Sequence, residues 1–442
     1  MFEIINKIEL AYSTYWLAYK SLRNQYSQDK INSIREIKFQ KLINHCYSNV
    51  KYYKELFRNN GLTPEKIKSI SDIRMIPVTK KEDLRSQFWD FFPREISACR
   101  ISRTSGSTGV PVCIFSDINS RKYNSVSVLR TRKLAGLPFF RKAIITPLKH
   151  NSDGNKSPHW TFLQGLHKTY YINPYIESDE NNKYADQLIR KIEEPAIIGI
   201  TSPIKALAQK VYEKKLPYFK PCTIITAGEI LYPETKDFIE NVFKQNVVDV
   251  YACNEAGEVA WQCPHSSLYH INAENCILEI LNKNNEPVSE GEVGEVVITN
   301  LNRYSLPFIR YKNGDLARAS YKFCSCGSKL PTFKEIIGRT GEDIHLPDGR
   351  SLQWNVLKGA MNHNLIRQFQ LIQNPDATLT VKYIPEKTEK VKEIENTLRE
   401  RFRELLPDTI SISYEVVKNI PINTSGKSKL VISNYNPAVS QK

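Results

Sequence analysis

The chain has 442 residues, of which 41% are hydrophobic and 25% charged, with a formal net charge of +15. This composition indicates a folded globular protein of two or three domains. The chain has no apolar run of about 18 residues, so we expect no transmembrane helix. Nine cysteines without a signal peptide predict a cytoplasmic protein with reduced thiols. The basic residues are not interleaved with stacking aromatics, so we expect solvated lysines and no nucleic-acid partner.

Residues 1–60 carry apolar side chains near helical spacing, which predicts helices packed on their own domain, with membrane-surface attachment as the alternative. The set is Ile4, Ile5, Ile8, Tyr12, Tyr15, Trp16 and Tyr19. Thr63-Pro-Glu65 has the residues of a helix start, with Thr63 as the cap.

Between residues 140 and 330, short apolar runs alternate with helical patterns, which favours an α/β sheet with parallel strands. The runs are Ala143–Thr146, Ala196–Ile200, Thr223–Thr226 and Val247–Val250, and the helical patterns cover 182–193, 203–214 and 234–245. Alternating strands at 276–282 and 294–300, with a turn at Asn284-Asn285, predict a smaller β region.

After Gly338 the pattern changes to that of a compact α+β domain of about 100 residues. Strands are expected at 379–383 and 410–416, with a helix from Val391 to Leu405 between them. The predicted fold class is therefore α/β. A large N-terminal domain, residues 1–340, has mixed and parallel sheets flanked by helices, and a small α+β domain covers residues 344–442.

A glycine- and hydroxyl-rich stretch runs from Arg103 to Pro111, with the sequence Arg-Thr-Ser-Gly-Ser-Thr-Gly-Val-Pro. Glycines let a backbone approach a polyanion, and hydroxyls add donors, so this loop is a candidate phosphate cradle. It lacks the Lys-Ser/Thr ending of the Walker loop, and a plain surface turn is the alternative.

Three further residues are candidates for nucleotide chemistry. Glu255 follows an expected parallel strand, where it could hold a cation, although an acid at a helix N-terminus is the alternative. Asp315, in the expected turn Asn313-Gly-Asp315, could bind a ribose diol, or simply belong to the turn. Lys427, in Pro421-Ile-Asn-Thr-Ser-Gly-Lys427, could neutralise a phosphate or remain solvated.

Cysteines and histidines suggest a structural zinc site, because zinc takes four nitrogen or sulfur ligands. The candidate ligands are Cys324 and Cys326, which we expect to share one tight turn, together with Cys263 and either His270 or His265 upstream. Reduced, partly buried thiols without metal are the alternative.

The order of these motifs resembles that of the adenylate-forming superfamily, and more closely its phenylacetate–CoA ligase-like family, in the capsular-polysaccharide-biosynthesis branch. Further support comes from Tyr52-Tyr53, Ile76-Pro-Val-Thr-Lys80, Thr201-Ser-Pro203 and Ala227-Gly-Glu229. The resemblance runs from about residue 35 to 435.

The resemblance implies an ATP- and magnesium-dependent ligase that forms an acyl-adenylate and passes the acyl group to the thiol of coenzyme A or to an amine. A role in capsule, surface-polysaccharide or secondary metabolism is implied too. The alternatives are an amide ligase joining an amino acid or uronic acid to a sugar-linked acceptor, and a nucleotide-binding homologue without catalysis. The oligomeric state is open, with a dimer as one option.

By the same resemblance, Lys427 reaches in during adenylation and Glu255 holds the magnesium. The other implied nucleotide contacts are Thr104, Ser105, Gly106, Ser107, Thr108, Gly109, Gly228, Glu229, Tyr251, Asn254, Arg310, Asp315 and Arg339. The small domain is expected to swing about Glu342 or Asp343. His270 is the preferred zinc ligand and His265 the reserve.

Two departures concern the segment Tyr251-Ala-Cys-Asn-Glu255. Relatives usually have Tyr-Gly-x-Ser/Thr-Glu, so Ala252 replaces a glycine and Asn254 replaces a hydroxyl residue. The Asn254 amide can still donate a hydrogen bond.

Overall fold

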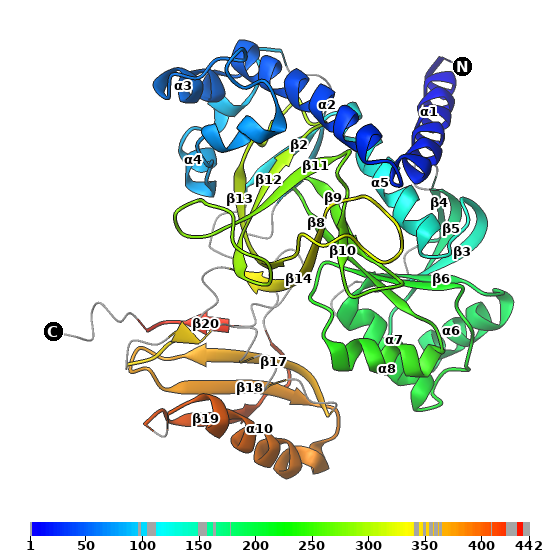
Figure 1. The fold of residues 1–442 in the computed structure, drawn as a ribbon. Helices are drawn as coiled ribbons and strands as arrows, with labels where there is room; N and C mark the ends of the chain where they lie inside the picture. The colour runs from blue at the N-terminus through cyan, green and yellow to red at the C-terminus, as the bar shows by residue number, and fades with distance from the viewer. Residues whose placement is uncertain are drawn as a thin grey trace. The chain divides into compact units, whose positions relative to one another are not determined.

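The computed structural model describes residues 2–95, 99–103, 112–148, 157–161, 165–176, 178–339, 344–347, 351–352, 357, 361, 365–407, 409–420 and 431–435. The chain divides into two compact units. The first lies within residues 1–336, and the second comprises Gly314–Leu316 and the chain from Ile337 (Figure 1). The α/β fold class is confirmed, whereas the boundary at 340–344 stays a prediction.

The first unit begins with helices, as expected: α1 (Phe2–Asn24), α2 (Gln28–Asn49) and α3 (Lys51–Asn59). Two 3-10 helices, η1 (Ile70–Met75) and η2 (Phe88–Phe91), flank α4 (Lys81–Ser86). The expected helix start at Thr63 is wrong. Thr63 accepts hydrogen bonds from the N–H groups of Lys66 and Ile67, which close a single turn that does not propagate. Ile67 is fully buried there, so the chain leaves the turn to bury it.

A twelve-stranded sheet forms the body of the first unit, in the order β11-β12-β13-β14-β10-β9-β8-β7-β6-β3-β5-β4. The parallel strands are β3 (Phe140–Pro147), β5 (Leu166–Ile172), β6 (Ala196–Ile200), β7 (Thr223–Ala227) and β8 (Val247–Cys253). Helices α6 (Asp179–Lys191), α7 (Thr201–Tyr212) and α8 (Pro233–Phe243) connect them and bury their apolar faces against the strands. The predicted strand–helix alternation is thereby confirmed.

The remaining strands of this sheet are mostly antiparallel: β4 (His159–Thr161), β9 (Gly257–Gln262), β10 (Tyr269–Ile271), β11 (Cys276–Leu281), β12 (Val293–Asn300), β13 (Tyr311–Ala319) and β14 (Thr332–Arg339). The turn expected at Asn313-Gly-Asp315 is wrong, because β13 runs through it. Gly314 takes φ +83°, so a turn-like residue is absorbed within the strand. The turn at Asn285 is confirmed by φ +62°.

Helix α1 packs along α5 (Ile118–Leu134), as Figure 1 shows, with Ala18 against Val126 and Leu129. The expected packing face is only partly right, since Tyr12, Trp16 and Tyr19 point to solvent. The buried side carries smaller or polar residues: Thr14, Ala18, Ser21 and Gln25. Among the described residues, no helix is long and apolar enough to cross a membrane.

The second unit contains a four-stranded sheet in the order β19-β18-β17-β20. Its strands are β17 (Ile366–Gln373), β18 (Leu379–Pro385), β19 (Ile412–Val416) and β20 (Val431–Ser433). Helix α10 (Val391–Leu405) covers the sheet with Ile394, Leu398 and Phe402, and η3 (Thr388–Lys390) precedes it. A short pair, β15 (Ile344–His345) and β16 (Ser351–Leu352), completes the unit.

Candidate functional site

The carboxyl ends of three neighbouring parallel strands, β6, β7 and β8, meet at one edge of the large sheet. Thr201 and Ser202 follow β6, Gly228 and Glu229 follow β7, and the turn containing Glu255 follows β8. Open α/β sheets bind ligands at such an edge. The sequence motifs expected in the site therefore share an edge, as parallel pairing requires.

Glu229 accepts hydrogen bonds from the first two residues of α7. Its carboxylate accepts a hydrogen bond from the Ser202 N–H at 2.9 Å, and its carbonyl accepts one from the Thr201 hydroxyl at 3.3 Å. Gly228 takes φ +80°, where a side chain would be strained. The Thr201 and Gly228 motifs are thus linked, although their contact with a nucleotide stays a prediction.

Glu255 sits in the tight connection between β8 and β9, which pair antiparallel with Cys253 opposite Gly257. No helix begins there, so the helix N-terminus alternative is wrong. The strand also continues through Tyr251 to Cys253, three residues beyond its expected end. Gly257 takes φ +74°, and a Cβ there would lie 2.1 Å from Asn124 Oδ1.

Three side chains hold three consecutive carbonyls of this turn. Arg303 Nη2 donates to the Asn254 carbonyl at 3.0 Å. Asn300 donates to that of Glu255 at 3.2 Å, and Asn275 donates to that of Ala256 at 2.9 Å. Glu255 is buried, and these three hydrogen bonds fix the position of its backbone.

Arg303 is a residue that sequence reasoning missed. It is buried, and within the part of the chain that the structure describes, its Nε and Nη1 atoms have no hydrogen-bond partner. Burial lowers the pKa of Arg303, and the negative charge of Glu255 is the largest influence that opposes this shift. A cation whose donors are unmet beside a buried carboxylate is costly, which marks it as a functional candidate.

Asp117 fixes the segment that carries Arg303. Its carboxylate accepts hydrogen bonds from the N–H groups of Ser120, Tyr304 and Ser305, at 2.7, 3.0 and 2.9 Å. Burial alone would raise the pKa of Asp117, but these N–H groups hold it below its usual value. Asp117 follows β2 (Cys113–Ser116), which pairs with β1 (Arg100–Arg103).

Arg310 is fully engaged within the first unit. Its guanidinium makes four hydrogen bonds: two to the Glu279 carboxylate at 3.0 Å, and one each to the carbonyls of Arg74 and Ile76 at 3.2 and 2.7 Å. Its backbone takes φ +46° and pairs with Thr79. Its place near a nucleotide stays a prediction, and the visible role is to anchor the start of β13.

Tyr251 and Asp315 occupy β8 and β13. The Asn313 amide donates to the Tyr251 hydroxyl at 2.7 Å, and the Tyr251 ring meets Phe333 edge-on at 6.3 Å. Asp315 follows two residues after Asn313 and is also buried.

Several predicted residues lie outside the described part of the chain: Thr104, Ser105, Gly106, Ser107, Thr108, Gly109, Glu342, Asp343 and Lys427. Arg339 ends β14, and its side chain is likewise not described. These assignments stay predictions.

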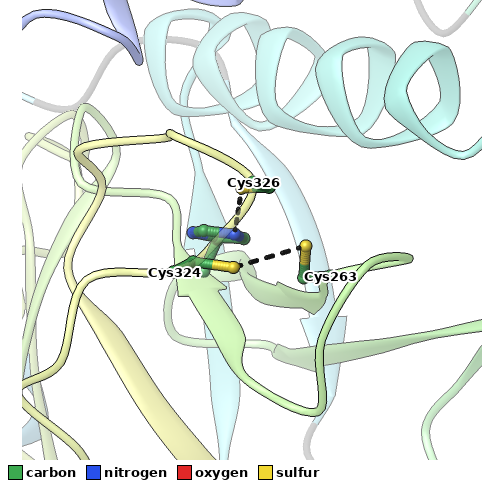
Figure 2. A group of neighbouring side chains, drawn as sticks. Cys263, Cys324 and Cys326 are labelled. Carbon is green, nitrogen blue, oxygen red and sulfur yellow. Dashed lines mark hydrogen bonds between the residues drawn. The ribbon is translucent and has the colours of Figure 1, made fainter.

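A second site gathers the predicted metal ligands. The ligand atoms of Cys263, His270, Cys324 and Cys326 all lie within 4.8 Å of one another. Figure 2 shows the side chains of the three cysteines gathered in one place. The Sγ atoms of Cys263 and Cys324 are 3.6 Å apart, and Cys326 Sγ is 3.3 Å from His270 Nε2. Two sulfurs on a tetrahedral zinc are about 3.8 Å apart, so the donor set fits that ion.

His270 joins this cluster because β10 pairs with β9 and brings His270 opposite Trp261, whose ring lies 4.8 Å away. Burial lowers the pKa of His270 to about 4, which keeps the imidazole neutral as a metal ligand requires. His265 contributes its backbone N–H, which donates to Cys263 Sγ at 3.5 Å.

The loop between β13 and β14, residues 320–331, carries Cys324 and Cys326, and we call it the cysteine loop. It also contacts the N-terminal helices. The Lys329 N–H donates to the Gln25 carbonyl at 2.7 Å. Leu330 packs with Ile31 of α2 and Ala273.

Known proteins resemble this chain in sequence and in fold. Residues 348–434 match the family model described as the CapK C-terminal domain. Protein CapK of Staphylococcus aureus is 22% identical over 94% of this chain and 92% of its own length. The phenylacetate-coenzyme A ligase of Thermus thermophilus is 25% identical over 87% of this chain and 86% of its own.

Among solved structures, 2-hydroxyisobutyryl-CoA ligase in the postadenylation state has the same fold. It aligns with a TM-score of 0.71 at 18% identity, covering 92% of this chain and 90% of its own. The motifs, the fold and these relatives agree. The chain is therefore similar over most of its length to CapK and to phenylacetate-coenzyme A ligases, its residues 348–434 match the CapK C-terminal domain, and it shares the fold of 2-hydroxyisobutyryl-CoA ligase.

Proposed function

We propose that the protein is an ATP-dependent, AMP-forming ligase that joins a carboxylic acid to the thiol of coenzyme A. In the first step, a carboxylate oxygen attacks the α-phosphate of ATP, and pyrophosphate leaves. In the second step, the thiol attacks the acyl carbon of the adenylate, loses its proton, and AMP leaves with the former carboxylate oxygen.

The observation that carries this proposal is the braced turn at the strand edge. It holds a buried carboxylate, Glu255, beside the incompletely bonded Arg303. Hard cations such as magnesium prefer carboxylate oxygens, and bridging phosphates with such a cation neutralises charge in phosphoryl transfer. We assign Glu255 as the magnesium ligand. Arg303 is a positioning residue that fixes the turn and adds positive charge there.

The remaining roles follow the resemblance to adenylate-forming ligases. Tyr251 lies against the adenine, Asp315 binds the ribose hydroxyls, and the hydroxyl-rich loop at Thr104–Gly109 holds the β- and γ-phosphates. Lys427 bridges the acyl carboxylate and the α-phosphate during adenylation. Such a ligase works by positioning and electrostatic stabilisation rather than by covalent catalysis.

A second acceptor follows from the resemblance to the capsule branch, of which residues 348–434 carry the CapK C-terminal domain. On that alternative the adenylate passes to an amine, joining an amino acid or uronic acid to a sugar-linked acceptor in capsule synthesis. The substitutions Ala252 and Asn254 keep a third option, nucleotide binding without turnover.

ATP–pyrophosphate exchange across aryl, fatty, amino and uronic acids tests the first step without knowledge of the acceptor. We expect exchange with at least one acid class. Adding coenzyme A or amino sugars then identifies the acceptor by product mass. ATP binding without exchange for any acid, in folded protein, would favour the non-catalytic option.

Two variants test the role assignments. Lys427→Ala should slow exchange by orders of magnitude with unchanged folding, because a charge bridging the reacting groups is lost. Lys392→Ala, on the exposed side of α10, is the matched control and should keep full activity. Equal rates for both variants would remove the assignment of Lys427.

We further propose that Cys263, His270, Cys324 and Cys326 hold a structural zinc ion. Four protein ligands leave no open coordination position, so this site would stabilise the fold and take no part in the reaction.

A further inference from the structure

Helix α1 turns three of its aromatic side chains away from the protein. Tyr12, Trp16 and Tyr19 are 74%, 51% and 49% exposed, and they recur at intervals of four and three residues. That spacing places them on one helical face. An ordinary surface helix buries its aromatic face, whereas α1 packs Tyr15 against Phe139 and Phe140 and leaves these three other rings exposed.

The exposed aromatic residues continue beyond α1. Tyr26, in the turn that follows α1, is exposed, and so is Phe323, in the loop whose Lys329 N–H donates to the Gln25 carbonyl. We call the exposed rings of Tyr12, Trp16, Tyr19, Tyr26 and Phe323 the aromatic face. From Tyr12 to Tyr19 the helical rise covers about 10 Å, so the three rings of α1 form a continuous apolar strip.

Basic residues accompany this aromatic face. Lys20 Nζ lies 5.0 Å from the Trp16 ring centroid, and Lys329 Nζ lies 5.2 Å from that of Phe323. Arg23 of α1 is also exposed, and Glu9 is the exposed acid among the described side chains of that helix. The face thus shares the sign of the whole chain, whose net charge is +15.

We propose that the aromatic face docks the protein on an anionic lipid surface, with α1 lying in the plane of the headgroups. Tyr and Trp rings favour the boundary between acyl chains and water. Lysine and arginine stems cover apolar surface while their charges reach anionic headgroups. A helix with this pairing lies on a bilayer without spanning it.

Other occupants fit less well. Single-stranded nucleic acid binds by stacking bases on ring faces, but Lys20 and Lys329 already cover the rings of Trp16 and Phe323. A second copy of the chain would bring like-charged faces together, which opposes association. Paired helices also favour aliphatic rather than tyrosine seams.

The test is co-sedimentation of the full chain with phosphatidylcholine vesicles, with and without phosphatidylglycerol. We expect binding only to the anionic vesicles and release by high salt. Tyr12→Ser/Trp16→Ser/Tyr19→Ser should lower binding by more than about tenfold. Lys20→Gln/Arg23→Gln should lower it roughly fivefold per residue.

Matched controls remove equivalent groups elsewhere. Trp89→Ser removes another exposed ring, 74% accessible, and Lys392→Gln/Arg403→Gln removes two charges from α10. Both should bind vesicles like the unaltered protein. All variants should keep the unaltered melting temperature, since the substituted side chains face solvent.

Two results would overturn the proposal: no binding to anionic vesicles, or binding that the α1 variants leave unchanged. Light scattering and oligonucleotide retention cover the other occupants. A dimer that the α1 variants dissociate, without vesicle binding, would assign the face to a second copy. Retention of single strands without vesicle binding would assign it to nucleic acid.

Discussion

Replacing Arg303 by methionine should separate stability from activity. Methionine keeps the unbranched stem of the side chain but lacks the guanidinium, whose central carbon lies 5.7 Å from the Phe308 ring centroid. The variant loses the hydrogen bond to the Asn254 carbonyl, which costs about 1.5–3 kcal/mol for a charged donor. It also removes two buried donors without partners among the described residues, each costing about 1–3 kcal/mol in the original.

These terms oppose each other, so we expect the free energy of unfolding to fall by no more than about 1 kcal/mol and to rise by no more than about 4 kcal/mol. Activity should respond differently, because the turn holding Glu255 loses a brace and the site loses a positive charge. We expect ATP–pyrophosphate exchange to fall roughly 10–100-fold, with a higher KM for magnesium-ATP.

The assay pairs urea denaturation with exchange kinetics at varied magnesium-ATP. Arg190→Met, on an exposed surface of α6, is the control and should alter neither quantity. The reasoning is refuted if Arg303→Met destabilises the protein by more than about 3 kcal/mol while the folded fraction keeps full activity. Arg303 would then be a structural residue only.

Three other perturbations test the structure. Chelation, or Cys324→Ser, should remove one equivalent of zinc, lower the melting temperature and raise hydrogen exchange at the start of α2. The control Cys222→Ser should change none of these three quantities. A metal-free protein of equal stability would refute the zinc site. Gly257→Ala should cost roughly 2–4 kcal/mol in urea denaturation, through positive φ and the clash with Asn124, and an unchanged midpoint would contradict that geometry. Asp117 has a depressed pKa when folded, so its stabilisation is complete above the unfolded value of about 3.9 and is lost as pH falls through the folded value. Asp117→Asn should therefore reduce the stability difference between neutral and acid pH, and an unaltered difference would count against the hydrogen bonds assigned to it.

The sequence was most informative where an element is buried along its whole length. The runs at Ala196–Ile200 and Thr223–Thr226 became central parallel strands because both faces of such strands are covered, which leaves continuous apolar sequence. Local turn chemistry was less reliable. Thr63 capped only one turn, and Gly314 was absorbed into β13, because burial of the flanking residues outweighed local preference.

The site was predictable only in part, since its support comes from residues distant in sequence. Glu255 was identifiable from its position after a strand, whereas Arg303, 48 residues further on, looks like any other arginine in a list. The choice of His270 required the pairing of β10 with β9, which spacing along the chain does not specify. The exposed aromatic face of α1 could not be predicted from the sequence either, because helical periodicity does not say which side of a helix packs against the protein.

The central claim is that a carboxylate is activated as its adenylate. The most direct measurement supplies an acid that supports exchange, labelled with oxygen-18 in the carboxylate, together with ATP and coenzyme A, and weighs the nucleotide product. The account predicts AMP carrying one labelled oxygen, because the carboxylate oxygen bonded to the α-phosphate leaves with AMP. Unlabelled AMP, or ADP with label in inorganic phosphate, would contradict it.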